Sequence, residues 1–231
     1  MRLKSALRRG VAAAVIAGIV VSSGIPAYAA RWNIADGDIT VKGASDESGN
    51  YNEVKQGDKG FEKDEGETVI TGKSKEHTVT IDTSGGKVDV TFDDLKIDVS
   101  GKAEVDGSDK AEVDGGGDSP VRESNAAVTV KGDHDAAIEL DGDNKLKSGS
   151  AHAGLEHNKT DTSGELTIQD NNKDGGSLKA TGGQFGAGIG GAGVNDAQVK
   201  ITGGKITAMP GKFLRAAILQ TASDCGIVER N

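Results

Sequence analysis

Ala153-Gly154-Leu155 and Ala187-Gly188-Ile189 begin two copies of one pattern within residues 148–208. In each copy two short alternating apolar segments follow, and glycines separate them. Repeats that keep their apolar segments while one loop changes length are typical of stacked repeat architectures. The equivalent apolar residues are Leu155 and Ile189, Ile168 and Ile201, and Leu178 and Ile206, at offsets of 34, 33 and 28 residues.

This repeat predicts an all-β fold, a right-handed parallel β-helix with about three short strands per coil. Strands of four or five residues joined by loops cannot form an α/β sheet, and an antiparallel sandwich does not generate a repeat that keeps its register. Equivalent strands of successive coils should stack about 4.8 Å apart, with their apolar side chains turned inward. We therefore expect each of the three residue pairs to be neighbours on adjacent coils.

The first 29 residues are predicted to be a signal peptide. Basic residues near the start precede an apolar stretch from Val11 to Val21, and Ala27-Tyr28-Ala29 is a small-residue cleavage pattern. The apolar stretch is short for a membrane span. We therefore expect a secreted or extracellular protein, with attachment to the cell surface left open.

The charge of the remaining chain limits its partners. Without the four basic residues of 1–29, 23 Lys and Arg face 36 Asp and Glu, a formal net charge of −13. Such a charge disfavours nucleic acid and anionic membrane as partners. We also expect no membrane insertion of the mature chain. Cys225 is the only cysteine, so no disulfide is expected within the chain.

The predicted β-helix domain covers residues 30–208, with an inserted polar loop at 101–125 and an atypical tail at 209–231. Residues 43–67 are mostly polar and predict a surface loop with a few apolar anchors. Trp32, just before the first strand, is interpreted as an apolar cap over one end of the stack, with a sugar-stacking platform as the alternative. The tail is either a short helical cap or the product of a lost reading frame.

Three strings resemble a known group of proteins: Ser150-Ala151-His152-Ala153-Gly154-Leu155, the glycine-rich run 186–191, and Gly203-Gly204-Lys205-Ile206-Thr207-Ala208. The chain resembles secreted right-handed β-helix proteins of Gram-positive bacteria, described as carbohydrate-binding-domain or adhesin-like proteins. It is similar, more loosely, to a clostridial β-helix family that binds polygalacturonate with calcium. The resemblance implies extracellular glycan binding without catalysis and assigns no binding residue.

One motif suggests a metal site. Asp170, Asn172 and Asp174 alternate ahead of Gly175, as in the first half of a calcium-binding loop. Position twelve is Thr181 where an EF-hand needs glutamate, so an Asx-rich turn is the simpler interpretation. Asp141 and Asp143 are a weaker candidate for a second cation site.

Other candidate groups fit catalysis less well. His152, Glu156 and His157 do not have the spacing of a metalloprotease motif, and a solvated loop is the simpler interpretation. Asp93-Asp94 and the acidic residues of 133–135 could serve a polysaccharide lyase or hydrolase, but acidic turns are common in this chain.

The sequence therefore predicts no enzyme. It predicts non-catalytic binding of polysaccharide or another surface glycan, with calcium as a possible aid. A stalk or adhesin module without a small ligand is the alternative, and a β-helix polysaccharide lyase or hydrolase is the third possibility.

Overall fold

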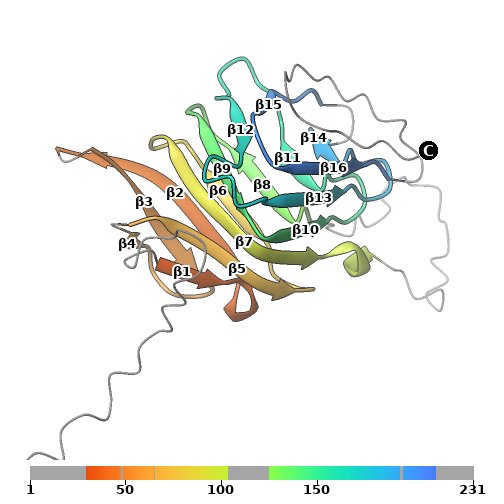
Figure 1. The fold of residues 1–231 in the computed structure, drawn as a ribbon, viewed down its shortest axis with the longest axis horizontal. Coiled ribbons are helices and arrows are strands. Elements are labelled where there is room, and N and C mark those ends of the chain that lie inside the picture. Colours follow the sequence, from red (N-terminus) through yellow and green to blue (C-terminus); the bar gives the residue numbers. More distant parts are fainter. Residues whose placement is uncertain (1–29, 48, 65, 104–124, 193–194, 212–231) are drawn as a thin grey trace, which may run out of the picture.

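The computed structural model describes residues 30–47, 49–64, 66–103, 125–192 and 195–211 (Figure 1). The predicted signal peptide, most of the predicted loop 101–125 and most of the tail 209–231 lie outside these residues. The described chain forms two β-sheets, of nine and seven strands, with two short 3-10 helices, η1 (Ile34–Asp36) and η2 (Ser100–Ala103). None of the helices in this part of the chain is long and apolar enough to cross a membrane.

The nine-stranded sheet is parallel throughout. Its central strand, β7, pairs with β9 along its first half and with β10 near its C-terminal end. Two arms of strands therefore extend from β7, and β5 and β1 follow on its other side. The strands are β1 (Ala30–Asn33), β5 (Thr68–Ser74), β7 (Val88–Asp98), β9 (Ala136–Asp141), β10 (Asp143–Lys147), β12 (Leu166–Gln169), β13 (Ser177–Thr181), β15 (Val199–Ile201) and β16 (Lys205–Met209).

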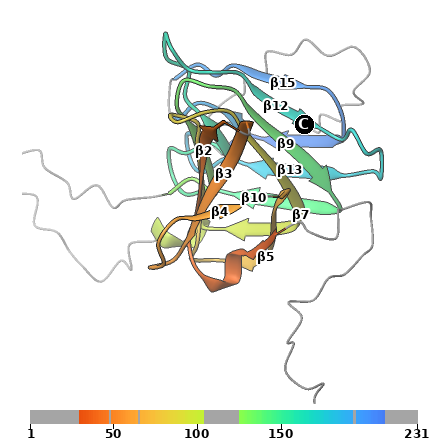
Figure 2. The same ribbon diagram turned by 90° about the vertical axis from the view of Figure 1, so that its left-hand side faces the viewer.

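The seven-stranded sheet has a parallel part and an antiparallel end. β14, β11, β8, β6 and β2 are parallel neighbours, and β3 and β4 continue the sheet beyond β2 in antiparallel pairing. Figure 2 shows β2, β3 and β4 together at one end of the molecule. The strands are β2 (Ile39–Asp46), β3 (Gly49–Gln56), β4 (Glu62–Asp64), β6 (Val79–Asp82), β8 (Val128–Lys131), β11 (Leu155–His157) and β14 (Ile189–Gly190).

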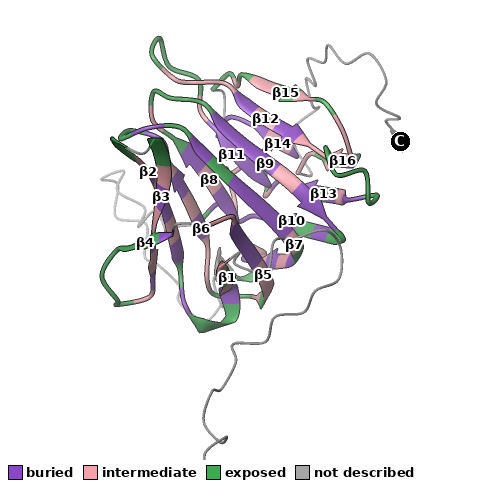
Figure 3. Cartoon of the chain, turned by 60° about the vertical axis from the view of Figure 1, so that its left-hand side comes forward, coloured by how far each residue is buried: buried purple, intermediate pink, exposed green. Residues whose placement is uncertain are grey.

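The residue pairs predicted from the repeat are neighbours in the structure. Leu155 pairs with Ile189, Ile168 with Ile201, and Leu178 with Ile206, each between parallel strands. Apolar residues that alternate with polar ones place one side of every strand against the interior. The corresponding buried positions run along β6, β8, β9 and β10 in Figure 3.

The predicted fold class is nevertheless wrong. A right-handed β-helix with three separate short strands per coil requires the segments 88–92 and 95–99 to be two strands on two faces. They form one strand of eleven residues, β7, which bends at Asp94, where φ is 53°. In the next layer only Gly142, with φ 62°, separates β9 from β10. One left-handed residue bends a strand path without ending the sheet, so both arms belong to a single curved sheet.

The predicted surface loop at 43–67 is also wrong. This polar segment contains all of β3 and β4, and Val54 on β3 is fully buried. The pairing of β3 with β2 runs from Ile39 opposite Gln56 to Asp46 opposite Gly49. Alternate residues of β3, namely Asn52, Val54 and Gln56, are buried, although only Val54 among them is apolar.

The core lies between the two sheets and consists mainly of Val, Ile, Leu and Ala, and Phe92 is the one fully buried aromatic residue in the described part of the chain. Each fully buried Val, Ile or Leu side chain stabilises the fold by about 1.5–3 kcal/mol when it is removed from water. Close stacking of the layers also needs glycine at one corner. A Cβ on Gly183 would collide with the carbonyl oxygen of Gly149, and one on Gly211 would collide with that of Gly183.

Candidate functional site

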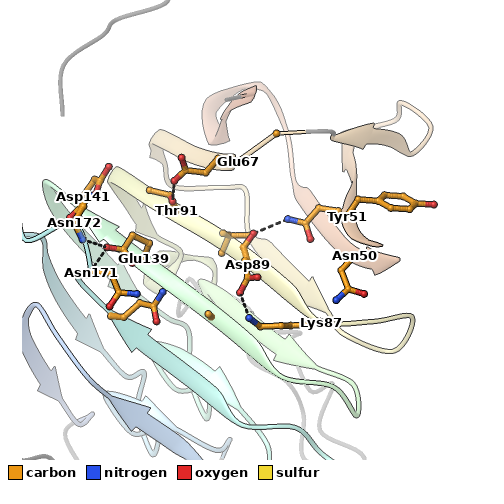
Figure 4. A pocket seen from close by; sticks show the side chains of 15 residues that line it. Asn50, Tyr51, Glu67, Lys87, Asp89, Thr91, Glu139, Asp141, Asn171 and Asn172 are labelled. Carbon is orange, nitrogen blue, oxygen red and sulfur yellow. Dashed lines mark hydrogen bonds and ion pairs between the residues drawn. The ribbon is translucent and has the colours of Figure 1, made fainter. Parts of the chain in front are cut away.

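A polar groove of about 510 Å³ crosses the outer face of the nine-stranded sheet. Strands β7, β9 and β12 form its floor, and strand β3 with the segment between β4 and β5 forms a wall (Figure 4). The groove is the space lined by Asn50, Tyr51, Asn52, Gly66, Glu67, Lys87, Asp89, Val90, Thr91, Ala137, Glu139, Asp141, Gln169, Asn171 and Asn172.

The floor follows from strand register. Thr91 on β7 lies opposite Glu139 on β9, and Glu139 lies opposite Gln169 on β12. The neighbouring residues on the same strands, such as Phe92 on β7 and Ile138 on β9, are buried in the core. Parallel neighbours stand about 4.8 Å apart, so these three polar side chains form a row across the strands. The row places a hydroxyl, a carboxylate and an amide at regular intervals along the groove.

Asn52 attaches the wall to the floor. Its side-chain amide donates to Thr68 Oγ1 and to the backbone oxygen of Asp89, both at 2.8 Å. Thr68 Oγ1 in turn donates to Asp64 Oδ2 at 2.9 Å. Asn52, Asp64 and Thr68 are all at most 8% exposed. Buried polar groups that satisfy one another fix a single arrangement of the backbone, so β3 is held at a defined distance from β7.

Carboxylates gather at one end of the groove. Thr91 Oγ1 donates to Glu67 Oε1, and the backbone N–H groups of Asn171 and Asn172 donate to Glu139 Oε1 at 2.6 and 3.2 Å. Asn172 also donates from its amide nitrogen to Asp141 Oδ1 at 2.7 Å. Figure 4 shows these side chains close together above β7 and β9. All of these donors are neutral, so the hydrogen bonds do not cancel the charge of the carboxylates.

Asp141 has a perturbed acidity. It is 2% exposed, and burial raises the pKa of its carboxyl to about 6 from an ordinary value of 3.8. The hydrogen bond from Asn172 opposes this rise in pKa, and the negative charges of Asp174, Asp93 and Glu67 add to it. Removal from water and nearby like charges both disfavour the ionised form.

The opposite end of the groove carries its one lysine among the described lining residues. Lys87 Nζ lies 3.0 Å from Asp89 Oδ1, and both side chains are exposed. The ring of Tyr51 points away from the carboxylates in Figure 4, and Lys63 Nζ lies 4.2 Å from the ring centre. The Tyr51 ring therefore does not form the floor of the groove.

The residues predicted to bind calcium form a local turn. Asp174 N–H donates to Asn172 Oδ1 at 3.3 Å, which is the Asx-type hydrogen bond of the simpler interpretation. The Asn172 amide nitrogen contacts Asp141 and Asp174. Asp170 Oδ1 is a buried atom without a hydrogen-bond partner. In the described part of the chain, no three His, Cys, Asp or Glu side chains are grouped to hold a metal ion. Calcium at Asp170, Asn172 and Asp174 stays a prediction.

The weaker candidate pair for a cation is divided between two strands. Asp141 ends β9 and faces Asn172, whereas Asp143 begins β10 and its Oδ1 accepts a hydrogen bond from Ser177 Oγ at 2.7 Å. Each carboxylate therefore already has a neutral donor of its own.

The solvated loop predicted for His152, Glu156 and His157 is wrong for two of them. Glu156 and His157 belong to β11 and are 4% and 2% exposed. His152 Nδ1 contacts Glu156 Oε2 at 2.7 Å. The ring nitrogens of His157 lie 3.3 and 2.9 Å from the backbone oxygens of Val130 and Gly164. His157 therefore links neighbouring segments and does not face a common ligand with His152.

The acidic residues considered for catalysis are dispersed. Arg31 forms an ion pair with Asp93 at the margin of the groove, and Asp94 occupies the bend of β7. Asp133 and Asp135 lie in the turn between β8 and β9, where Asp135 Oδ1 accepts from the Glu165 N–H at 2.9 Å. None of these four residues lines the groove.

Trp32 packs against the core, as its interpretation as a cap expects. It lies on β1 at the edge of the nine-stranded sheet and is partly buried against the core cluster. Its indole N–H donates to Asp64 Oδ2 at 3.2 Å. The Trp32 ring therefore joins the same polar network that holds the wall of the groove.

Sequence reasoning missed the groove, although part of its signal was present. Glu139 and Asp141 alternate with the buried Ile138 and Leu140, so both had to lie on the outer face of one strand. The wall could not be expected, because β3 comes from a polar segment without apolar alternation. Comparison with protein-family models, with curated proteins and with solved structures finds no match to this chain.

Proposed function

We propose that this chain is a non-catalytic polysaccharide-binding protein and that the glycan occupies the groove. The observation that carries the proposal is the lining of the groove. Of its fifteen described residues, eight are Asn, Gln, Asp or Glu outside the wall anchor Asn52: Asn50, Glu67, Asp89, Glu139, Asp141, Gln169, Asn171 and Asn172.

Such a lining suits a polyhydroxylated ligand. Sugar hydroxyls both donate and accept hydrogen bonds, amide side chains offer both functions, and carboxylates accept strongly. Sites for drug-like molecules are lined mostly by hydrophobic and aromatic side chains, whereas eleven of the fifteen described residues around this groove have polar or charged side chains. Thr91, Glu139 and Gln169 place one polar group on each of three neighbouring strands, so successive sugar units can each meet one polar group.

The proposed setting is extracellular, at a bacterial surface. It depends on the signal peptide predicted at residues 1–29 and on the resemblance at 150–155, 186–191 and 203–208. The acidic charge of the chain is compatible with a ligand that carries no phosphate.

Glycan-array binding and pull-down on insoluble polysaccharides test the proposal. Gln169→Ala removes an amide from the floor of the groove and should weaken the binding of a retained glycan by about fivefold, which is the value of one neutral hydrogen bond. Gln198→Ala is the matched control, because Gln198 is exposed and does not line the groove. Failure of every glycan to bind would favour a stalk without a ligand. Equal effects of the two substitutions would move the binding site elsewhere.

The same assay tests the predicted calcium. Binding and thermal unfolding should be measured with added Ca²⁺ and with chelator. A change in either quantity that is lost in Asp174→Asn would place calcium at the predicted loop, and no change would remove calcium from the proposal.

A second candidate function is glycoside hydrolysis, which one observation favours. Asp141 holds its proton to about pH 6 and shares the groove with Glu139 and Glu67, and pairs of carboxyls with different pKa values perform acid and base catalysis in glycosidases. Release of reducing sugar from a bound glycan, abolished by Asp141→Asn, would replace the non-catalytic proposal.

A further inference from the structure

The charge of the groove is strongly unbalanced. Four carboxylates, Glu67, Asp89, Glu139 and Asp141, line it, and Lys87 is the one cation among its described lining residues. Lys87 lies at the far end, where it pairs with Asp89 at 3.0 Å. The end that contains Glu67, Glu139 and Asp141 therefore has three carboxylates and no cation in its described lining.

The hydrogen bonds at this end leave the negative charge in place. Glu67 accepts from the Thr91 hydroxyl, Glu139 from two backbone N–H groups, and Asp141 from the Asn172 amide. These neutral donors orient the carboxylate oxygens without neutralising them. An ammonium group of a ligand placed here would form charge-assisted hydrogen bonds, which are stronger than those from the neutral donors.

Two carboxylates outside the groove lining add to the negative charge near Asp141. Asp93 and Asp174 both act on the Asp141 carboxyl, and their charges help to raise its pKa to about 6. Arg31 pairs with Asp93, which offsets one of these two charges. A cation bound beside Glu139 and Asp141 would relieve repulsion among groups that the fold holds together.

Resting on the proposed function, we infer that the groove selects a polysaccharide that carries free amino groups, such as a polymer of 2-amino-2-deoxyhexose, and rejects polymers of uronic acid. The ammonium groups lie at the end formed by Glu67, Glu139 and Asp141, and the sugar hydroxyls meet the amides of Gln169 and Asn171.

This inference departs from the polygalacturonate ligand of the looser family resemblance. A uronate in this groove would place its carboxylate among four others, and a single lysine already paired with Asp89 cannot compensate for them. Charge-assisted hydrogen bonds from an ammonium to Glu139 and Asp141 instead add attraction and selectivity at once.

The test compares oligosaccharides of different charge and includes polylysine as a polycation without sugar. Glucosamine oligomers, the corresponding N-acetylglucosamine oligomers, galacturonate oligomers and polylysine of similar length are titrated into the protein at neutral pH and low ionic strength. We expect the glucosamine oligomer to bind at least about tenfold more tightly than its acetylated counterpart, with an affinity that falls as salt is added. The galacturonate oligomer should not bind.

Glu139→Gln supplies the matched variant, because glutamine keeps the oxygen that accepts from Asn171 and Asn172 and loses only the charge. It should weaken glucosamine binding by about fivefold and change binding of the acetylated oligomer by less than about twofold. Glu62→Gln is the control, since Glu62 is exposed on β4 and does not line the groove. Circular dichroism and thermal unfolding confirm that both variants are folded.

The outcomes separate the two proposals. Tighter binding of the acetylated or the acidic oligomer would overturn the preference for amines and leave polysaccharide binding intact. Polylysine bound as tightly as the glucosamine oligomer would mean that the groove recognises charge without sugar, which overturns both. Failure of all four ligands to bind would overturn the preference for amines, and the glycan array would then decide polysaccharide binding itself.

Discussion

At the scale of single residues, Asp141 is the aspartate whose ionisation the fold opposes most clearly. The end of β9 places its carboxyl at 2% exposure beside other carboxylates, and its pKa rises to about 6. Between about pH 4 and 6 the folded protein keeps a proton that the unfolded chain has released. The free energy of unfolding therefore falls as pH rises through this window, and the loss is complete above it.

Asp141→Asn should remove this loss. Asparagine cannot ionise, and its side-chain oxygen can still accept from Asn172. The variant should be more stable than the parent protein by about 1–3 kcal/mol near neutral pH and should have no advantage below about pH 4. Urea unfolding of both proteins across this pH range measures the difference. A variant less stable than the parent near pH 7 would contradict the account, and Asp161→Asn, in an exposed loop, should leave the profile unchanged.

At the scale of elements, equivalent strands of the repeat differ in how completely they are covered. Ile168 on β12 is fully buried and lies between β9 and β15. Ile201, its counterpart on β15, is only partly buried, because β15 stands at the end of its sheet in the described structure. The same side chain in the same register therefore has two different energetic roles.

Ile168→Ala should cost about 2–5 kcal/mol of unfolding free energy, whereas Ile201→Ala should cost about 1 kcal/mol. The buried site loses both transfer energy and packing around a cavity, and the edge site loses only part of the transfer energy. Chemical denaturation of the two variants gives both values. Equal costs would show that other residues cover Ile201 as fully as Ile168.

At the scale of the whole molecule, the two ends are finished differently. At the N-terminal end, β3 and β4 pair in antiparallel fashion, and one hydrogen-bonded network connects the partly buried Trp32 with the buried Asp64 and Thr68. At the other end, β14, β15 and β16 each pair with a single strand among the described residues. Strands with one neighbour have fewer hydrogen bonds to lose when they open locally.

Hydrogen exchange should reveal this difference. Amides of β15 and β16 should exchange at least about tenfold faster than those of β9 and β10, which pair on both sides. Peptide-resolved mass spectrometry after deuterium labelling measures both regions in one experiment. Equal protection would mean that further residues or a second molecule cover the end strands.

Much of the strand pairing could be predicted from the sequence. Leu155 and Ile189, Ile168 and Ile201, and Leu178 and Ile206 could be matched because a period of two residues identifies the inner face of each strand. A repeat in which apolar positions recur leaves few alternative registers. These neighbours are therefore determined by local patterns of side chains.

Only the tertiary structure decided the number of sheets and the existence of the groove. Whether β7 continues through Asp94 depends on one left-handed residue and on the strands packed beside it, which no local pattern reveals. The polar segment 49–64 became a wall through the contacts of Asn52 with Thr68 and Asp89, far away in the chain. The burial of Asp141, and the raised pKa that burial causes, followed from the same long-range packing.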